Sequence, residues 1–342
     1  MQKVRLGRTE LMVSELGFGG IPIVGLGSDQ AEDVVRHCFE RGINFFDTAN
    51  MYGDSESKLG RALGSVRDQV ILATKSLERG ADGLNQHLEN SLKCLATDYI
   101  DVYQLHSITK PVDLEQILAP GGALEAVVKA KEAGKVRFIG ISSHARSVAL
   151  KAIETGYFDT VQFPFNFVET DADTDLFPAA RERDMGIIGM KPLGGGMLSR
   201  ADLCFKFLQQ NAHVVPIPGF SSIEEADEVI DLYENRQPLT DADQAEMEAI
   251  KKELGSSFCH RCGYCLPCEQ GVMIPESLMF RPIIHRLGEA IAVAMSKPAV
   301  SGIEECTQCG ECAERCPYGL PVPELLAENL ALFRELEAKF AP

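Results

Sequence analysis

The chain has 342 residues, of which 45% are hydrophobic, and 33 basic against 50 acidic residues give it a formal net charge of −17. This share of apolar residues is sufficient for a sizeable core and excludes a largely disordered chain. The acidic excess would repel nucleic-acid phosphates and anionic lipid surfaces, so neither is an expected partner.

The predicted elements begin with a hairpin over residues 3–13, with Gly7 at its turn, that could plug a barrel floor. From Leu16 to about Pro216, short β-branched runs alternate with longer amphipathic segments, which is typical of repeated βα units. The eight runs are ELGFG, INFFDT, VILATK, IDVYQL, VRFIGIS, TVQFPF, GIIGMKPL and VVPIPG. Helices are predicted over residues 84–96, 113–133, 145–155, 171–184 and 223–233. Eight such units predict a (β/α)8 TIM barrel over residues 1–254.

A second, smaller domain is predicted over residues 255–342, where cysteine runs, proline and glycine replace the alternation. Helices are expected within it over residues 276–295 and 322–339.

Eight of the 11 cysteines lie in this second domain, in two tight runs. In a chain that is expected to be cytosolic, such runs indicate metal ligands rather than disulfides. The other three, Cys38, Cys94 and Cys204, are scattered and are expected to be small buried hydrophobic residues.

Four polar residues follow predicted strands, where a barrel places its active-site mouth: Asp47, Tyr52, Lys75 and His106. Taken singly, each residue is more often a packing residue or a solvated charge than a catalyst. As a set they suit carbonyl reduction, because the Lys75 ammonium would stabilise the phenolate of Tyr52 and ease its proton donation. Asp47 would hold Lys75 in place, and His106 would donate a hydrogen bond to the substrate oxygen.

The stretches around these residues resemble the aldo/keto reductase superfamily: FFDTANMYGDSESKLGRAL, the TKS around Lys75, DVYQLH and GKVRFIGIS. The resemblance covers about residues 3–252, and the four family residues carry over without substitution. It implies a barrel that transfers hydride between a bound NAD(P)H and an aldehyde or ketone.

The resemblance also implies contacts with the nicotinamide end of the cofactor. Ser142 and Gln162 would hold the carboxamide, with Ser143 standing where the family usually has Asn. Met190 stands where an aromatic residue usually stacks on the nicotinamide. Further implied contacts are Gly20 and Ile21 beside the nicotinamide, and Lys191, Leu193 and Gly194 near the pyrophosphate.

The adenosine half of the cofactor would meet the segment PIPGFSSIEEADE. Where NADPH-preferring relatives commonly offer Lys or Arg, this segment offers Gly219, Ser221, Ser222, Glu224 and Glu225. Carboxylates repel a 2′-phosphate and can bond ribose hydroxyls, so NADH is favoured over NADPH.

The run CTQCGECAERCP, residues 306–317, has the bacterial ferredoxin spacing, in which the fourth cysteine binds the other of two clusters. CHRCGYCLPC, residues 259–268, repeats its first part but has only two residues before its last cysteine and no following proline. By this logic two [4Fe-4S] clusters are expected, with Cys259, Cys262, Cys265 and Cys316 binding one. Cys306, Cys309, Cys312 and Cys268 would bind the other. Two all-cysteine zinc sites are the alternative.

The helical spacer between the two runs resembles the α-helical dicluster ferredoxin domains found fused to oxidoreductases. Hydride transfer needs no iron, and no flavin motif is present to convert between two-electron and one-electron transfer. The clusters would therefore either stabilise the small domain or exchange electrons with a ferredoxin or another redox protein, and the sequence leaves both open.

The leading prediction is a carbonyl reductase or alcohol dehydrogenase acting on a small-molecule substrate. The alternative is an iron-sulfur electron-transfer or redox-sensing protein whose barrel binds a nicotinamide nucleotide. We expect a cytoplasmic protein, because the sequence shows neither an apolar run long enough for a membrane span nor a signal peptide.

Overall fold

The computed structural model describes residues 1–254, 259, 261, 263–316 and 318–340. The chain divides into two compact units, which are Met1–Leu193 with Arg200–Pro238, and Gly194–Ser199 with Leu239–Pro342. The predicted boundary between residues 254 and 255 borders residues outside the described ranges and stays a prediction. By this division the last helix before that boundary, α10 (Asp241–Leu254), belongs to the second unit.

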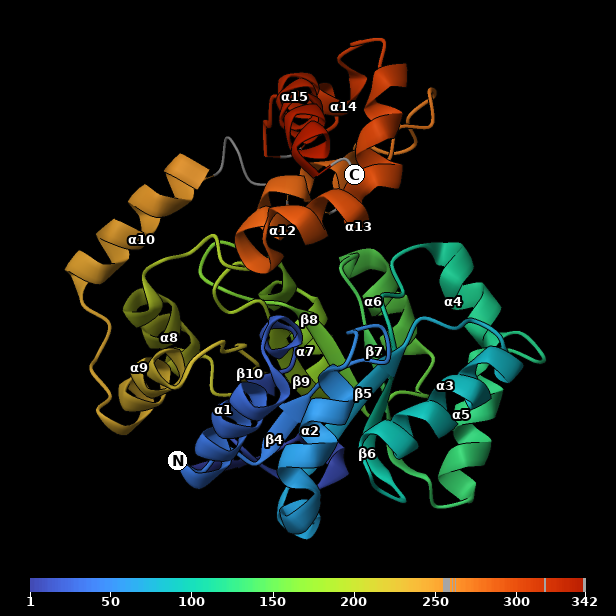
Figure 1. Cartoon of the computed structure of the whole chain (residues 1–342), viewed down its shortest axis with the longest axis vertical. Helices are drawn as coiled ribbons and strands as arrows, with labels where there is room; N and C mark the ends of the chain where they lie inside the picture. The colour runs from blue at the N-terminus through green and yellow to red at the C-terminus, as the bar shows by residue number, and fades with distance from the viewer. Residues whose placement is uncertain (255–258, 260, 262, 317, 341–342) are drawn as a thin grey trace. The chain divides into compact units, whose positions relative to one another are not determined.

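Eight parallel strands form the sheet of the first unit, in chain order from β3 to β10 (Figure 1). They are β3 (Phe18–Gly19), β4 (Phe45–Asp47), β5 (Ile71–Ser76), β6 (Ile100–Leu105), β7 (Val136–Ser142), β8 (Thr160–Pro164), β9 (Gly186–Met190) and β10 (Val214–Pro216). The first and last strands are joined by backbone hydrogen bonds from Gly17 N to Pro216 O at 2.9 Å and from Gly19 N to Pro218 O at 2.7 Å. The sheet is thus closed, and the predicted (β/α)8 barrel is confirmed.

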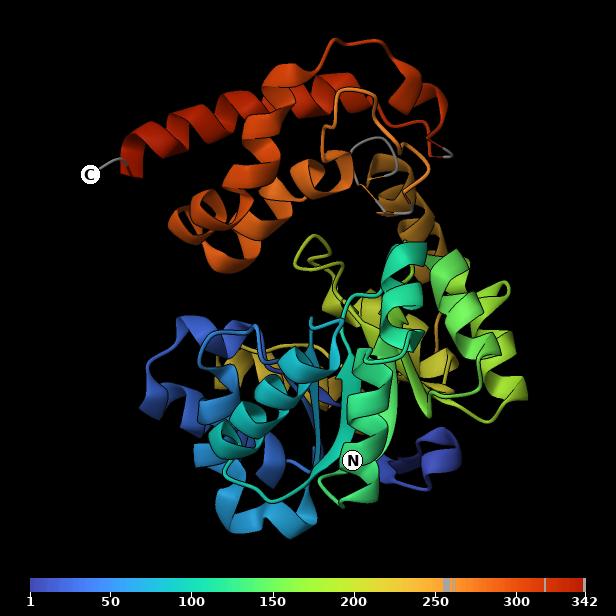
Figure 2. The same ribbon diagram turned by 90° about the vertical axis from the view of Figure 1, so that its right-hand side faces the viewer.

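Helices surround the strands, as Figure 2 shows from the side. They are α1 (Ser28–Glu40), α2 (Ser55–Leu63), α3 (Ala81–Cys94), α4 (Pro111–Leu118), α5 (Ala123–Glu132), α6 (Arg146–Glu154), α7 (Leu176–Glu182), α8 (Ala201–Gln210) and α9 (Ile223–Glu234). The helix predicted over residues 171–184 is shorter, because a 3-10 turn, Asp171–Asp173, precedes α7.

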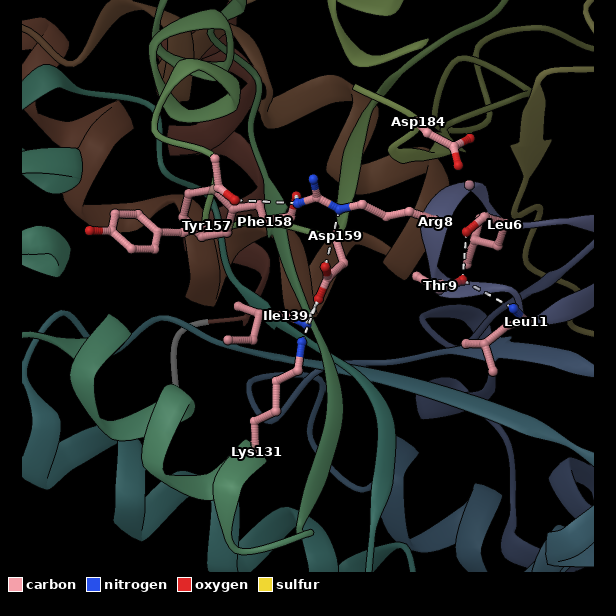
Figure 3. Close-up of polar contacts among 12 residues, drawn as sticks. Leu6, Arg8, Thr9, Leu11, Lys131, Ile139, Tyr157, Phe158, Asp159 and Asp184 are labelled. Carbon is pink, nitrogen blue, oxygen red and sulfur yellow. Dashed lines mark hydrogen bonds and ion pairs between the residues drawn. The ribbon is translucent and has the colours of Figure 1, made fainter. Parts of the chain in front are cut away.

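The barrel floor is closed by the predicted hairpin, made of β1 (Lys3–Arg5) and β2 (Met12–Ser14). Its connecting residues are fixed by hydrogen bonds that Figure 3 shows. Arg8 donates to Asp159 Oδ1 at 3.2 Å and to the Phe158 carbonyl at 2.6 Å, while Lys131 contacts Asp159 Oδ2 at 3.0 Å. Asp159 directly precedes β8, so the hairpin lies at the end of the barrel where the strands begin.

The second unit is helical in its described residues, as expected, but the helix predicted over residues 276–295 is divided among three helices. It contains α10, α11 (Ile274–Leu278), α12 (Phe280–Leu287), α13 (Glu289–Ser301), α14 (Glu311–Glu314) and α15 (Val322–Phe340). A separate hydrophobic core includes Val272, Phe280, Val300, Leu326 and Phe333. None of the described helices of the chain is long and apolar enough to cross a membrane.

Candidate active site

Asp47 and Lys75 form a buried ion pair at the C-terminal ends of β4 and β5. Lys75 Nζ lies 2.5 Å from Asp47 Oδ1 and donates to the Thr48 carbonyl at 2.7 Å. Each of the two residues is only 2% exposed. Gln104 and Gln162 also donate to the Asp47 carboxylate, at 2.8 and 3.4 Å. The ion pair is therefore held from β6 and β8 as well as by its own two strands.

Burial has the largest influence on both members of this pair. It raises the pKa of Asp47, an effect that the charge of Lys75 and the three donors oppose. Burial alone would lower the pKa of Lys75, but attraction to Asp47 and then to Tyr52 outweighs it, so the pKa of Lys75 is raised. Lys75 is thus an ammonium ion at neutral pH.

The Tyr52 ring lies close to this ammonium and to the imidazole of His106. Lys75 Nζ is 5.0 Å from the centre of the Tyr52 ring, and the Tyr52 and His106 rings meet edge to face with centroids 5.8 Å apart. Burial, reinforced by the charges of Lys75 and Arg79, lowers the pKa of His106 well below its usual 6.5. The imidazole is therefore neutral, and its buried Nδ1 has no partner among the described residues. The structure thus brings all four predicted catalytic residues together.

Ser142 and Gln162 are neighbours in the register of β7 and β8. Ser142 Oγ accepts a hydrogen bond from Ser107 N at 2.9 Å, whereas Gln162 Oε1 is buried and has no partner in the described part of the chain. An acceptor of this kind fits an amide N–H of a bound carboxamide. Ser143 differs, because its hydroxyl donates to the Ile108 carbonyl at 2.7 Å and so connects the end of β7 to the loop after β6.

The residues predicted near the pyrophosphate follow β9. Lys191 has a left-handed backbone, with φ of 59°, and its Nζ lies 3.1 Å from His144 Nε2. Met190 packs against the core inside the barrel. Gly194 belongs to the second unit, and the roles of Leu193 and Gly194 stay predictions.

The residues predicted near the adenosine cap the N-terminus of α9. Ser222 Oγ accepts from Glu225 N at 3.2 Å, and Glu225 Oε2 accepts from Ser221 N at 2.7 Å. Gly219 lies just before this cap, where an added Cβ would be 2.4 Å from Pro22 Cδ. Their contacts with a cofactor stay predictions.

Sequence reasoning missed three buried side chains that support the site: Gln104, Ser55 and Lys58. Gln104 lies two residues before His106, so alternation along β6 could have placed it on the same inward face. Ser55 and Lys58 lie in a polar stretch, and no periodic signal marks them as buried.

The predicted cluster ligands gather in the second unit. One pocket is lined by Cys265, Cys268, Cys306, Cys309 and Cys312. The predicted ligand Cys262 lies outside the described residues. None of the cysteines in the described ranges forms a disulfide. No three His, Cys, Asp or Glu side chains in those ranges converge closely enough to hold a metal ion.

The two cysteine runs share an unusual backbone. Arg261 and Gln308, each two residues after the first cysteine of its run, have left-handed φ of 56° and 57°. Gly263 and Gly310, two positions further on, have φ of 80° and 82°. Non-glycine residues rarely adopt this conformation, so matched turns at equal offsets indicate two equivalent loops. An all-thiol donor set on such loops fits iron-sulfur clusters.

Cys38 and Cys204 are buried as expected, but Cys94 is only half-buried. The expectation for Cys94 was therefore wrong in degree. It is the last residue of α3, where a side chain can remain partly in solvent.

Comparison with known proteins finds a matching family for the barrel sequence and another for the cysteine-rich sequence. Residues 15–203 match the aldo/keto reductase family, and residues 258–320 match a 4Fe-4S dicluster domain. The chain is 27% identical to a probable aldo-keto reductase of Glycine max over 332 residues, 92% of this chain and 91% of that protein. It is 35% identical to the uncharacterized oxidoreductase YrpG of Bacillus subtilis over 229 residues, 58% and 68% of the two chains. Among solved structures, the holo form of an aldo-keto reductase from Bacillus halodurans superimposes with a TM-score of 0.64 at 25% identity, covering 73% of this chain and 96% of that one.

Proposed function

Because the chain belongs to the aldo/keto reductase family of oxidoreductases, we propose that its barrel interconverts a small aldehyde or ketone and the corresponding alcohol, using NAD(P)H and Tyr52. The buried Asp47–Lys75 pair carries this proposal. It holds the Lys75 ammonium beside the Tyr52 ring, which also meets the imidazole of His106 edge to face.

The barrel offers a suitable place for the nicotinamide. When bound, a nicotinamide supplies or accepts a hydride. Gln162 Oε1, the buried acceptor without a partner in the described residues, would accept a hydrogen bond from the carboxamide, and Ser142 lies beside it in the sheet. Gly20 and Ile21, which follow β3, would line the ring.

Proton transfer is assigned to Tyr52. The Lys75 ammonium stabilises the phenolate, which eases transfer of the phenol proton to the oxygen that becomes an alcohol. Asp47 keeps Lys75 charged and in place, and the neutral His106 can donate a hydrogen bond to the carbonyl oxygen.

We propose further that NADH is preferred over NADPH. The first turn of α9 carries the carboxylates of Glu224 and Glu225, and a 2′-phosphate near them would be repelled. Comparison of kcat/KM for the two cofactors tests this, and equal or better use of NADPH would overturn it.

The second unit is proposed to bind two [4Fe-4S] clusters with the crossed cysteine sets given by the sequence. Support for cluster binding comes from the matched left-handed loops and from the pocket that Cys268 lines together with Cys306, Cys309 and Cys312. Cys265, which the crossed sets give to the other cluster, lines the same pocket, so the division into sets rests on the sequence spacing. Iron and acid-labile sulfide content of anaerobically purified protein tests the proposal, and stoichiometric zinc in place of iron would contradict it. The ferredoxin-type partner stays a prediction.

The decisive experiment measures anaerobic oxidation of NADH and NADPH by the cluster-loaded protein with a panel of small aldehydes and ketones. We expect turnover with at least one carbonyl and a loss of about a hundredfold or more in Tyr52→Phe, which lacks the acid. Retention of turnover by Tyr52→Phe would remove Tyr52 from its assigned role. Absence of any carbonyl turnover by the wild-type protein would favour the electron-transfer alternative.

A further inference from the structure

Lys58 is a buried lysine on α2 that the tetrad does not use. Its side chain is almost fully enclosed, and the residue is 4% exposed. Nζ donates to three backbone carbonyls of one loop, those of Ile23 at 2.9 Å, Val24 at 3.3 Å and Leu26 at 2.7 Å. Asp54, one turn earlier on the chain, lies 2.9 Å from the same ammonium. Its three backbone acceptors therefore all belong to this loop.

The other end of the same loop is held by Ser55, the first residue of α2. Ser55 Oγ donates to the Gly20 carbonyl at 2.7 Å and lies 2.8 Å from Thr48 Oγ1. Gly20 N donates in turn to the Asp47 carbonyl at 2.7 Å. The loop from Gly20 to Leu26 is thus attached at both ends to the beginning of α2.

The loop has little internal structure of its own. Its short 3-10 turn, Pro22–Gly25, is closed by backbone bonds from Val24 N to Ile21 O at 3.2 Å and from Leu26 N to Ile23 O at 3.1 Å. Removing the Lys58 ammonium would leave three carbonyls without this donor. Unmade hydrogen bonds at buried groups are costly, so the loop would move toward water or other donors.

We propose that Lys58 is a positioning residue for the nicotinamide, because it fixes the loop carrying Gly20 and Ile21 to the helix that begins three residues after Tyr52. This inference rests on the proposed function, which places the nicotinamide against Gly20 and Ile21. Lys58 sets the position of that loop relative to Tyr52. The side chains predicted near the adenosine half are held by their own capping bonds at the start of α9, although Gly219 beside them lies against Pro22 of the loop. Loss of Lys58 therefore weakens recognition of the nicotinamide half selectively.

The test compares Lys58→Met with a control on the same helix, Arg61→Met. Arg61 is half-exposed and pairs with Asp29 and Glu32 at the surface, so its removal takes a cation from α2 without touching the loop. Binding of NADH and of ADP-ribose, which lacks the nicotinamide, is measured for the wild type and each variant. Hydrogen-deuterium exchange of the loop amides is followed in the same proteins.

In Lys58→Met we expect NADH affinity to fall about tenfold or more, since bonds to a charged donor are lost. ADP-ribose affinity should stay within about twofold, because the side chains predicted to contact the adenosine are held by capping bonds that do not involve Lys58. Loop amides should exchange faster, and Arg61→Met should match the wild type in every measurement. Lys58→Gln, which keeps an N–H donor, should show the same pattern to a smaller extent and replaces the methionine variant if that one does not fold.

Equal weakening of NADH and ADP-ribose would show a general structural role and overturn the inference. Unchanged NADH binding in both Lys58 variants would overturn it as well. A wild-type protein that binds neither NADH nor NADPH would instead refute the proposed function, a result that the variants cannot produce.

Discussion

Asp47 accepts hydrogen bonds from side chains on three other strands of the barrel. Lys75 comes from β5, Gln104 from β6 and Gln162 from β8. Donors to a carboxylate favour its ionised form, and the carboxylate in turn keeps Lys75 charged. The ammonium beside Tyr52 therefore depends on two glutamines in addition to the predicted tetrad.

Gln104→Leu should weaken catalysis without disrupting the barrel. The substitution removes a donor 2.8 Å from Asp47 Oδ2 and also removes the buried Gln104 Oε1, which has no partner in the described residues. Loss of a bond to a charged group predicts a fall in kcat of about tenfold to a hundredfold. The pKa of Asp47 should rise further, moving the acid limb of the pH–rate profile to higher pH. An unchanged profile with full activity would show that Gln104 does not tune the ion pair.

His106 should make the stability of the protein depend on pH below about 6.5. Its pKa is lowered in the folded state by burial and then by Lys75 and Arg79, so the unfolded chain binds the extra proton first. The contribution of neutral His106 to the free energy of unfolding is complete above the pKa that His106 has in the unfolded chain. It is lost as the pH falls toward the pKa of His106 in the folded protein. Between pH 6.5 and 5.5 the free energy of unfolding should fall by about 1 kcal/mol for this reason.

Urea unfolding of the wild type and His106→Asn at pH 7.5, 6.5 and 5.5 checks this expectation. The variant should lose less stability on acidification, and the difference between the two proteins cancels acid effects on the clusters. The same pH slope in both would mean that His106 titrates normally in the folded protein.

Among the elements, the floor hairpin depends on one glycine. Gly7 has φ of 52°, and an added Cβ would lie 2.2 Å from Gly186 N, a backbone atom that cannot move aside. Gly134, with φ of 77° and nothing within 4 Å of an added Cβ, has the same backbone requirement without the contact. Comparing alanine substitutions at the two positions therefore distinguishes the cost of backbone strain from the cost of a steric clash.

Gly134→Ala should therefore cost about 1 kcal/mol of unfolding free energy, and Gly7→Ala about 2 to 4 kcal/mol. Thermal unfolding of the barrel measures both. KM values should not change in either variant, because the hairpin lies at the opposite end of the strands from the tetrad. Equal losses in the two variants would show that the hairpin yields to the added methyl group.

Strand positions were predictable because inward-facing apolar residues and the polar residues that end each strand leave a direct pattern in the sequence. Helix ends were less predictable. The single helix expected over residues 113–133 is two helices, α4 and α5, interrupted at Pro120–Gly122. Pro120 has no backbone N–H to donate and Gly121 has a left-handed φ of 75°, so the helix ends here. The composition on both sides of this break favours a helix, and the prediction gave the proline and the two glycines too little weight.

The tetrad was predictable for the same reason as the strands, since each member occupies a fixed place after one of them. The side chains that support the tetrad were not predictable from the sequence. Lys58 is buried only because the loop after β3 folds over it and offers three carbonyls. A lysine in a polar helix turn has no local feature that distinguishes this position from a solvated one.

On the scale of the whole molecule, the two units have separate cores and separate chemistry. All eight cysteines of the two runs lie in the second unit, and the described ones other than Cys309 belong to its core or pack against it. Metal binding of this kind contributes directly to the folding of a small domain. Cluster loss should therefore affect the second unit first.

Cys306→Ser should reduce the iron content by about four atoms per chain and lower the melting temperature of the second unit. The barrel transition and NADH binding should remain as in the wild type. Cys204→Ala, which removes a fully buried thiol of α8, is the matched control. It should leave iron unchanged and destabilise only the barrel, by about 1 kcal/mol. Calorimetry with iron analysis distinguishes these outcomes, and an equal loss from both transitions in Cys306→Ser would mean that the barrel does not fold independently of the clusters.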